Sequence, residues 1–140
     1  GRPTWADADE PRRVAEAALG MGLSFVVLTS VNRDDLPDGG AGAFAATLRE
    51  LRLRRADVGV EFLTPDFRNT QANAARVFAE TLAALPEGAS RALVWGHNVE
   101  TVPRLYKEAR KGAKYERSLA LLGIGLAGLG WARRRRNTES

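Results

Sequence analysis

Polar side chains that can bind a small ligand follow each of three predicted strands. The strand over residues 23–28 passes directly into hydroxyl, amide and carboxylate groups, and the strands over residues 58–63 and 91–95 end in the same way. In proteins with parallel strands between helices, ligands bind at the carboxyl ends of the strands. Groups of these types, with glycines that allow close approach, suit a zwitterionic ligand that carries hydroxyls, such as an amino acid or a nucleoside. The candidate residues are Thr29, Ser30, Asn32, Asp34 and Asp35 after the first strand, Thr64 and Asp66 after the second, and His97, Asn98, Glu100 and Thr101 after the third.

These strands alternate with predicted helices. Apolar periodicity and the Gly and Pro residues at its breaks predict helices over residues 10–19, 42–55, 71–85, 102–110 and 115–122. Strands that alternate with helices of this length indicate a parallel sheet with crossover connections. The predicted fold class is therefore α/β, and three strands are about what the central section of a larger (β/α) barrel of the TIM type contains.

The last part of the chain has a different character. Residues 123–140 combine a glycine-rich stretch with the arginine run 133–136 and follow neither helical nor strand periodicity. We therefore expect residues 1–122 to form the core domain and residues 123–140 to form a disordered basic tail.

Each candidate site residue also has a purely structural interpretation. A single histidine such as His97 is more often packed or capping than a ligand. Asp66 follows a proline and is typical of a turn, while Glu100 precedes a predicted helix and favours its N-terminus. Residues 34–40 can form a loop that caps the next helix. The gathering of polar groups at three strand ends, rather than any single residue, favours a binding site.

The composition excludes several classes of site. The chain contains no cysteine and one histidine, so its own residues cannot form disulfides, zinc ribbons or thiolate-held iron–sulfur clusters. Neither a nucleophile–base pair nor a phosphate-binding P-loop is present. The net charge of +4 depends on the arginine run 133–136, and the aromatic residues are sparse, which argues against a nucleic-acid surface. No stretch is long and apolar enough for a membrane span.

Four stretches of the sequence, in this order, resemble lipoyl synthase, a radical S-adenosylmethionine (SAM) enzyme: VVLTSVNRDDLPDGG, VEFLTPDFR, HNVETVPRLY and RKGAKYERSL. The resemblance covers about residues 1–122. It implies a partial (β/α) barrel with a radical-SAM core, and an enzyme that inserts two sulfur atoms into an octanoyl chain on a lysine of a carrier protein. One iron–sulfur cluster then cleaves SAM to a 5′-deoxyadenosyl radical, and a second, auxiliary cluster supplies the sulfur.

The resemblance also implies roles for ten residues. One group of residues is implied to bind the cofactor, either near the methionine end of SAM or on the side shared by cofactor and substrate. A second group is implied to bind the substrate, and its two arginines contact a carboxylate or support the structure. The cofactor-binding group is Thr29, Ser30, Asn32, Asp34, Asn98 and Glu100, and the substrate-binding group is Asp66, His97, Arg110 and Arg117.

The implied cofactors are SAM and two [4Fe–4S] clusters, but this chain lacks the cysteines of the CxxxCxC motif and of the auxiliary cluster. The implied partner is an octanoylated lipoyl carrier domain or the carrier protein of glycine cleavage, with no nucleic acid and no membrane. The implied compartment is the mitochondrion or plastid of a eukaryote, or the cytoplasm of a bacterium. We expect the chain alone to be inactive. The alternatives are a non-catalytic domain that binds a nucleoside or a carrier protein, and an unstable fragment.

Overall fold

The computed structural model describes the backbone of residues 6–135 as alternating strands and helices. This alternation confirms the predicted α/β class, and each predicted strand and helix up to residue 101 is found within a few residues of its predicted bounds. The elements are α1 (Glu10–Gly20), β1 (Phe25–Thr29), α2 (Ala41–Arg54), β2 (Gly59–Leu63), α3 (Gln71–Ala83), β3 (Val94–Gly96), a 3-10 helix (Pro103–Leu105), α4 (Tyr106–Ala109) and α5 (Tyr115–Arg135).

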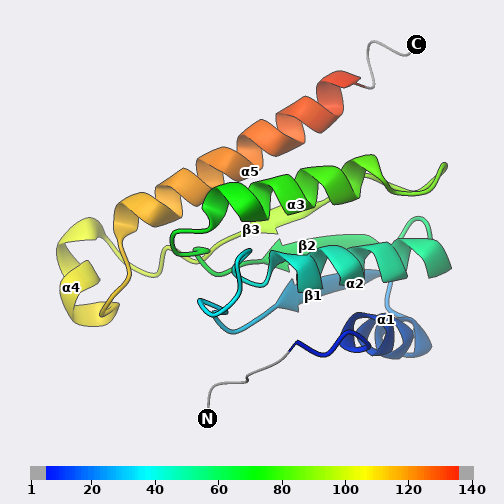
Figure 1. The fold of residues 1–140 in the computed structure, drawn as a ribbon, viewed down its shortest axis with the longest axis horizontal. Helices are drawn as coiled ribbons and strands as arrows, with labels where there is room; N and C mark the ends of the chain where they lie inside the picture. The colour runs from blue at the N-terminus through cyan, green and yellow to red at the C-terminus, as the bar shows by residue number, and fades with distance from the viewer. Residues whose placement is uncertain (1–5, 136–140) are drawn as a thin grey trace.

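The three strands form one parallel sheet in the order β1-β2-β3. The register pairs Thr29 with Leu63, and Leu63 in turn with Gly96, so the last residues of the three strands stand in one row. The arrowheads of the strands accordingly lie toward the same end of the molecule, the end that also carries α4 (Figure 1). The polar segments that follow the strands therefore start side by side.

Four helices line one side of the sheet. Figure 1 shows α2 and α3 next to each other over the strands, with α1 beyond α2 and α5 beyond α3. The contacts between helices follow the same order: α1 packs on α2, α2 on α3, and α3 on α5. Helix α5 also contacts β3. The helices thus form a single layer that follows the order of the strands.

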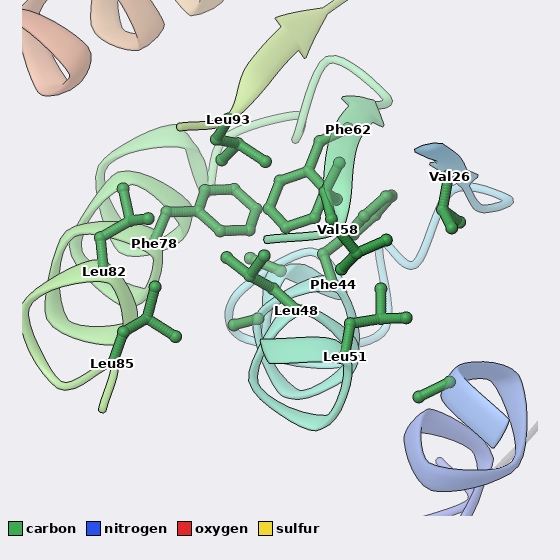
Figure 2. Close-up of a cluster of buried hydrophobic side chains, with 14 of the residues drawn as sticks. Val26, Phe44, Leu48, Leu51, Val58, Phe62, Phe78, Leu82, Leu85 and Leu93 are labelled. Atoms are coloured by element: carbon green, nitrogen blue, oxygen red, sulfur yellow. The ribbon is translucent and has the colours of Figure 1, made fainter. Parts of the chain in front are cut away.

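The core lies between this helix layer and one face of the sheet. Alternate strand residues such as Val26 and Phe62 are buried against α2 and α3. The ring of Phe62 lies with its centroid 5.2 Å from that of Phe44 on α2 and 5.2 Å from that of Phe78 on α3, and Figure 2 shows these rings at the centre of the cluster. Phe78 continues the contact to Trp95 of β3 at 4.7 Å. A chain of aromatic rings therefore joins two helices to two strands.

The opposite face of the sheet is exposed. Phe25, Val27 and Val94 have exposed fractions of 49%, 52% and 49%, although all three are apolar strand residues. The Phe25 ring lies across Gly59 on the neighbouring strand, where a β-carbon would come within 2.4 Å of the ring. Both faces of the sheet thus carry apolar side chains, as parallel strands usually do, although Glu61 stands between Val27 and Val94 on the exposed face. Only one face is covered by the residues described.

The end of the chain differs from the sequence-based expectation. The predicted helix over residues 115–122 is found, but α5 continues beyond it to Arg135, where the sequence predicts a tail from residue 123 onward. Gly125 is buried against the Trp95 indole, where a β-carbon would come within 3.1 Å of the ring, so close packing on β3 compensates the low helix propensity of glycine. Residues 136–140 of the predicted tail lie outside the described residues. Within residues 6–135, no helix has the combined length and apolar character of a membrane span.

A second difference concerns the segment after β3. The sequence predicts one helix over residues 102–110, whereas the structure has a 3-10 turn at Pro103–Leu105 followed by the single-turn α4. Pro103 occupies the first position of the 3-10 turn, where its missing N–H costs nothing.

Arg52 is a buried cation at the amino end of the sheet. Its exposed fraction is 3%, and its guanidinium donates to the carbonyls of Val58 and Ala92, the latter at 2.7 Å. Burial lowers the pKa of Arg52, because desolvation penalises the charged form. The side chain ties the end of α2 to the residues that enter β2 and β3.

Because neighbouring valines of β1 lie on different faces of the sheet, we expect the same substitution to have different effects on stability. Val26→Thr keeps the branched shape but buries an unpaired hydroxyl, so we expect it to lower the free energy of unfolding by about 1–3 kcal/mol. Val27→Thr places the same hydroxyl in solvent and is expected to stay within about 0.5 kcal/mol of the parent chain. Urea unfolding followed by circular dichroism measures both, and equal losses would contradict the assignment of the faces.

Arg52 predicts a second stability difference. Arg52→Met leaves the buried Val58 carbonyl and the part-buried contact at the Ala92 carbonyl without their donor, and is expected to cost about 2 kcal/mol in the same unfolding measurement. Arg49→Met, at an exposed position of the same helix, is the matched control and is expected to change stability by less than about 0.5 kcal/mol. A loss at Arg49 as large as that at Arg52 would refute the role of the buried guanidinium.

Candidate functional site

A cavity of about 560 Å³ lies where the three strands end. This volume falls in the range of small-molecule sites. The segments after β1, β2 and β3 and the residues around the end of α4 contribute its walls. All ten residues to which the sequence assigns binding roles line this one cavity: Thr29, Ser30, Asn32, Asp34, Asp66, His97, Asn98, Glu100, Arg110 and Arg117.

The predicted gathering of these residues is therefore found, while the ligand that each one binds stays a prediction. Of the other candidates at the strand ends, Thr64 also lines the cavity, whereas Asp35 and Thr101 are not among its lining residues.

The loop after β1 combines a wall of the cavity with a helix cap. The Asp38 carboxylate accepts hydrogen bonds from the backbone N–H groups of Gly40 (2.9 Å) and Gly42 (2.7 Å), which satisfies free donors at the start of α2. The capping interpretation is therefore confirmed for this part of the loop. Asp35 forms an ion pair with Arg33 at 2.8 Å, and this hydrogen bond raises the pKa of Arg33.

Two ion pairs cross the cavity wall between segments. Arg68 Nη1 lies 3.4 Å from Asp34 Oδ2 and joins the loops after β2 and β1. Arg117 Nε lies 3.5 Å from Asp66 Oδ2, with side chains only 17% and 12% exposed, and joins the loop after β2 to α5. Asp66 also accepts from the backbone N–H of Arg68 at 3.2 Å, as expected for a turn residue. Asp66 thus has both the structural role and a place in the cavity.

His97 is held by protein groups at both ring nitrogens. Nδ1 lies 2.8 Å from the Thr64 carbonyl, and Nε2 lies 2.9 Å from the Ser118 hydroxyl. Because a carbonyl only accepts, Nδ1 carries a proton and donates to it. The histidine therefore ties the end of β3 to β2 and to α5, and a ligand reaches its nitrogens only by displacing one of these partners.

Arg110 is fixed by its surroundings through one nitrogen. Its Nη1 donates to the Asn98 carbonyl at 3.0 Å and to the Tyr106 hydroxyl at 3.1 Å. The Tyr106 hydroxyl donates in turn to the Val99 carbonyl at 2.8 Å. Arg110 is thereby attached to the segment that follows β3.

A subset of the lining side chains is free to meet a ligand. Within residues 6–125, these side chains have no hydrogen-bond or ion-pair partner, and they include a hydroxyl, two amides, a carboxylate and an ammonium group. Such a set can pair with both charges of a zwitterion and with hydroxyl or ring-nitrogen groups. The free side chains are those of Thr29, Asn32, Asn98, Glu100 and Lys111.

Sequence reasoning missed four residues of the site. Arg68 and Lys111 line the cavity, and each stands in the sequence within two residues of a predicted site residue. Tyr106 and Ser118 lie behind the wall, with exposed fractions of 5% and 0%. Ser118 lies one helical turn before the buried Leu121, so a polar residue on an apolar helix face was the available signal.

The chain is similar in sequence to known enzymes over most of its length. No family model matches the chain. Over 122 residues, 87% of its length, the chain is 49% identical to a lipoyl synthase of Mycobacterium sp. (strain KMS) and 48% identical to that of Alcanivorax borkumensis. It is 54% identical over 121 residues to the lipoyl synthase of Trichlorobacter lovleyi. The chain is a homologue of the lipoyl synthases.

The homology covers part of those proteins. The chain spans 34% of the Mycobacterium protein, 35% of the Alcanivorax protein and 39% of the Trichlorobacter protein, or somewhat more than a third of each relative's length. The resemblance seen in the four sequence stretches is thereby confirmed, and the cavity lies within a segment homologous to enzymes of this name.

The tie between His97 and Ser118 predicts a stability effect. Ser118→Ala removes a buried hydroxyl and leaves the part-buried Nε2 of His97 without its partner, so we expect a loss of about 1–3 kcal/mol in the free energy of unfolding. Ser24→Ala, at an exposed position, is the control and is expected to be neutral within about 0.5 kcal/mol. A neutral Ser118→Ala variant would show that the tie between β3 and α5 contributes no stability.

Proposed function

We propose that the cavity is the part of a lipoyl synthase that holds SAM and faces the octanoyl chain of a carrier protein. The observation that carries this proposal is the convergence of ten residues, drawn from four separate segments, on one cavity in a chain homologous to lipoyl synthases. The acyl substrate is carried by a lipoyl domain or by the carrier protein of glycine cleavage.

The free polar groups of the cavity suit SAM. The Glu100 carboxylate complements the ammonium group of its methionine end, and Lys111 or Arg110 complements the carboxylate. The amides of Asn32 and Asn98 can pair with ribose hydroxyls or with the nitrogens of adenine. SAM supplies the 5′-deoxyadenosyl group when it is cleaved, and these residues bind and orient it.

The iron–sulfur clusters of the family do not fit this chain. It contains no cysteine, and residues 6–135 contain no group of three or more His, Asp or Glu side chains that could hold a metal ion. Cluster ligands must therefore come from other residues than these 140. We propose that the 140-residue chain by itself does not cleave SAM.

The exposed face of the sheet supports a partial barrel. Parallel strands are normally covered on both faces, and the apolar side chains of Phe25, Val27 and Val94 are those expected to face the interior of a (β/α) barrel. In this arrangement the cavity stands at the carboxyl-end rim of the barrel, where the known sites of such folds lie.

A segment exchange tests the proposed function. We expect a Trichlorobacter lovleyi lipoyl synthase, in which the homologous segment is replaced by residues 1–122 of this chain, to lipoylate an octanoylated carrier domain and to form 5′-deoxyadenosine. The same exchange with Glu100→Gln is expected to raise the KM for SAM by about tenfold, because one charge-assisted contact is lost. Mass spectrometry of the carrier domain and chromatography of the nucleoside measure both products.

The controls separate failure of folding from failure of function. The exchanged enzyme must show the cluster absorbance of the parent, and the isolated chain, given SAM, reductant, iron and sulfide, must yield no 5′-deoxyadenosine. A folded, cluster-containing exchange that binds SAM and forms no lipoyl product would contradict the proposal.

The absence of cysteine favours one other candidate function, a non-catalytic domain that binds a nucleoside or a carrier protein. The segment exchange distinguishes the two. A domain of this kind binds SAM or the carrier through the same cavity but does not restore sulfur insertion.

A further inference from the structure

Arg110 lines the cavity, and one nitrogen of its guanidinium is occupied by protein groups. Nη1 makes both of the hydrogen bonds that fix the side chain, to the Asn98 carbonyl and to the Tyr106 hydroxyl. The guanidinium carbon also lies 5.5 Å from the centroid of the Tyr106 ring, within the range of a cation–π contact. Within residues 6–125, Nε and Nη2 have no hydrogen-bond partner. These two nitrogens form the fork that binds a carboxylate through two parallel hydrogen bonds.

Tyr106 is itself held rigidly. It is 5% exposed, its hydroxyl donates to the Val99 carbonyl at 2.8 Å, and it lies 3.3 Å from the hydroxyl of Ser118. Its ring meets that of Tyr115 edge to face, with centroids 5.4 Å apart. The tyrosine therefore joins α4, α5 and the segment after β3, and its oxygen has one fixed place at which to accept the hydrogen bond from Arg110.

We propose that Tyr106 is a positioning residue that orients Arg110, so that the Nε–Nη2 edge of the guanidinium binds the carboxylate of the ligand. Tyr106 does not touch the ligand and acts only through Arg110. Without the hydroxyl, the long arginine side chain regains rotamer freedom, which binding must then remove. This proposal rests on the proposed function for its ligand, the amino-acid end of SAM, and adds the residue that orients Arg110 toward the carboxylate.

The test compares SAM with decarboxylated SAM, which lacks only the carboxylate. Binding to the 140-residue chain is followed through the NMR shifts of the backbone amides of residues 97–100. We expect Tyr106→Phe, which keeps the ring, to weaken SAM binding about three- to tenfold and to leave decarboxylated SAM within about twofold. Tyr115→Phe removes a hydroxyl from the neighbouring ring and is the matched control, expected to change neither affinity.

A double-mutant cycle with Arg110→Gln shows whether Tyr106 acts through the arginine. We expect Arg110→Gln to remove the preference for SAM over the decarboxylated compound, and Tyr106→Phe to have no further effect in that background. The proposal would be overturned if Tyr106→Phe weakened the binding of both compounds equally. It would also be overturned if Tyr106→Phe weakened SAM binding as much in the Arg110→Gln variant as in the parent chain.

The same measurement distinguishes this inference from the proposed function. If both compounds bind the cavity with equal affinity in the parent chain, Arg110 does not read the carboxylate and the inference fails, while SAM binding stands. If neither compound binds, the inference fails together with SAM binding by this chain, and the segment exchange decides whether the residues serve a lipoyl synthase.

Discussion

The parallel register of the three strands is the constraint on which the site depends. Because Thr29, Leu63 and Gly96 stand in one row, the three polar segments that follow them start about one strand spacing apart. The aromatic chain from Phe44 through Phe62 and Phe78 maintains this register from the covered face of the sheet. At the other end of the strands, Arg52 binds the carbonyls of the segments that enter β2 and β3. The cavity is thus a consequence of how the strands are aligned, and at the cavity itself His97 adds to this alignment through its contact with the Thr64 carbonyl.

The cavity wall is closed by contacts between segments that are distant in the sequence. His97 joins β3 to the end of β2 and to Ser118 on α5, while Arg117 on α5 approaches Asp66 after β2. In these contacts charged and polar side chains have a structural role. Among residues 6–125, amide, hydroxyl, carboxylate and ammonium groups that line the cavity remain without a protein partner. This separation between structural side chains and side chains without a protein partner explains how a site rich in ion pairs still offers polar groups to a ligand.

Much of the fold and of the site can be predicted from the sequence, because both depend on local patterns. Apolar runs that end abruptly in polar residues identify the strands and their carboxyl ends, and parallel pairing then places Asn32 and Asn98 in the same cavity. What the sequence does not reveal depends on distant partners. The helix beyond residue 122 forms although glycines break the pattern, because Gly125 packs closely on Trp95. The roles of Tyr106 and Ser118 likewise depend on contacts with Arg110 and His97 that no local pattern encodes.

We propose that the three strand ends form one binding site for SAM. The most direct measurement is a map of the backbone amide groups whose NMR shifts change when SAM is added to the 140-residue chain. We expect saturable changes that gather in residues 29–34, 64–68, 97–100 and 109–117, with α1, α2 and α3 unaffected. Changes confined to the exposed sheet face around Val27 and Val94, or spread evenly over the helices, would contradict the proposal.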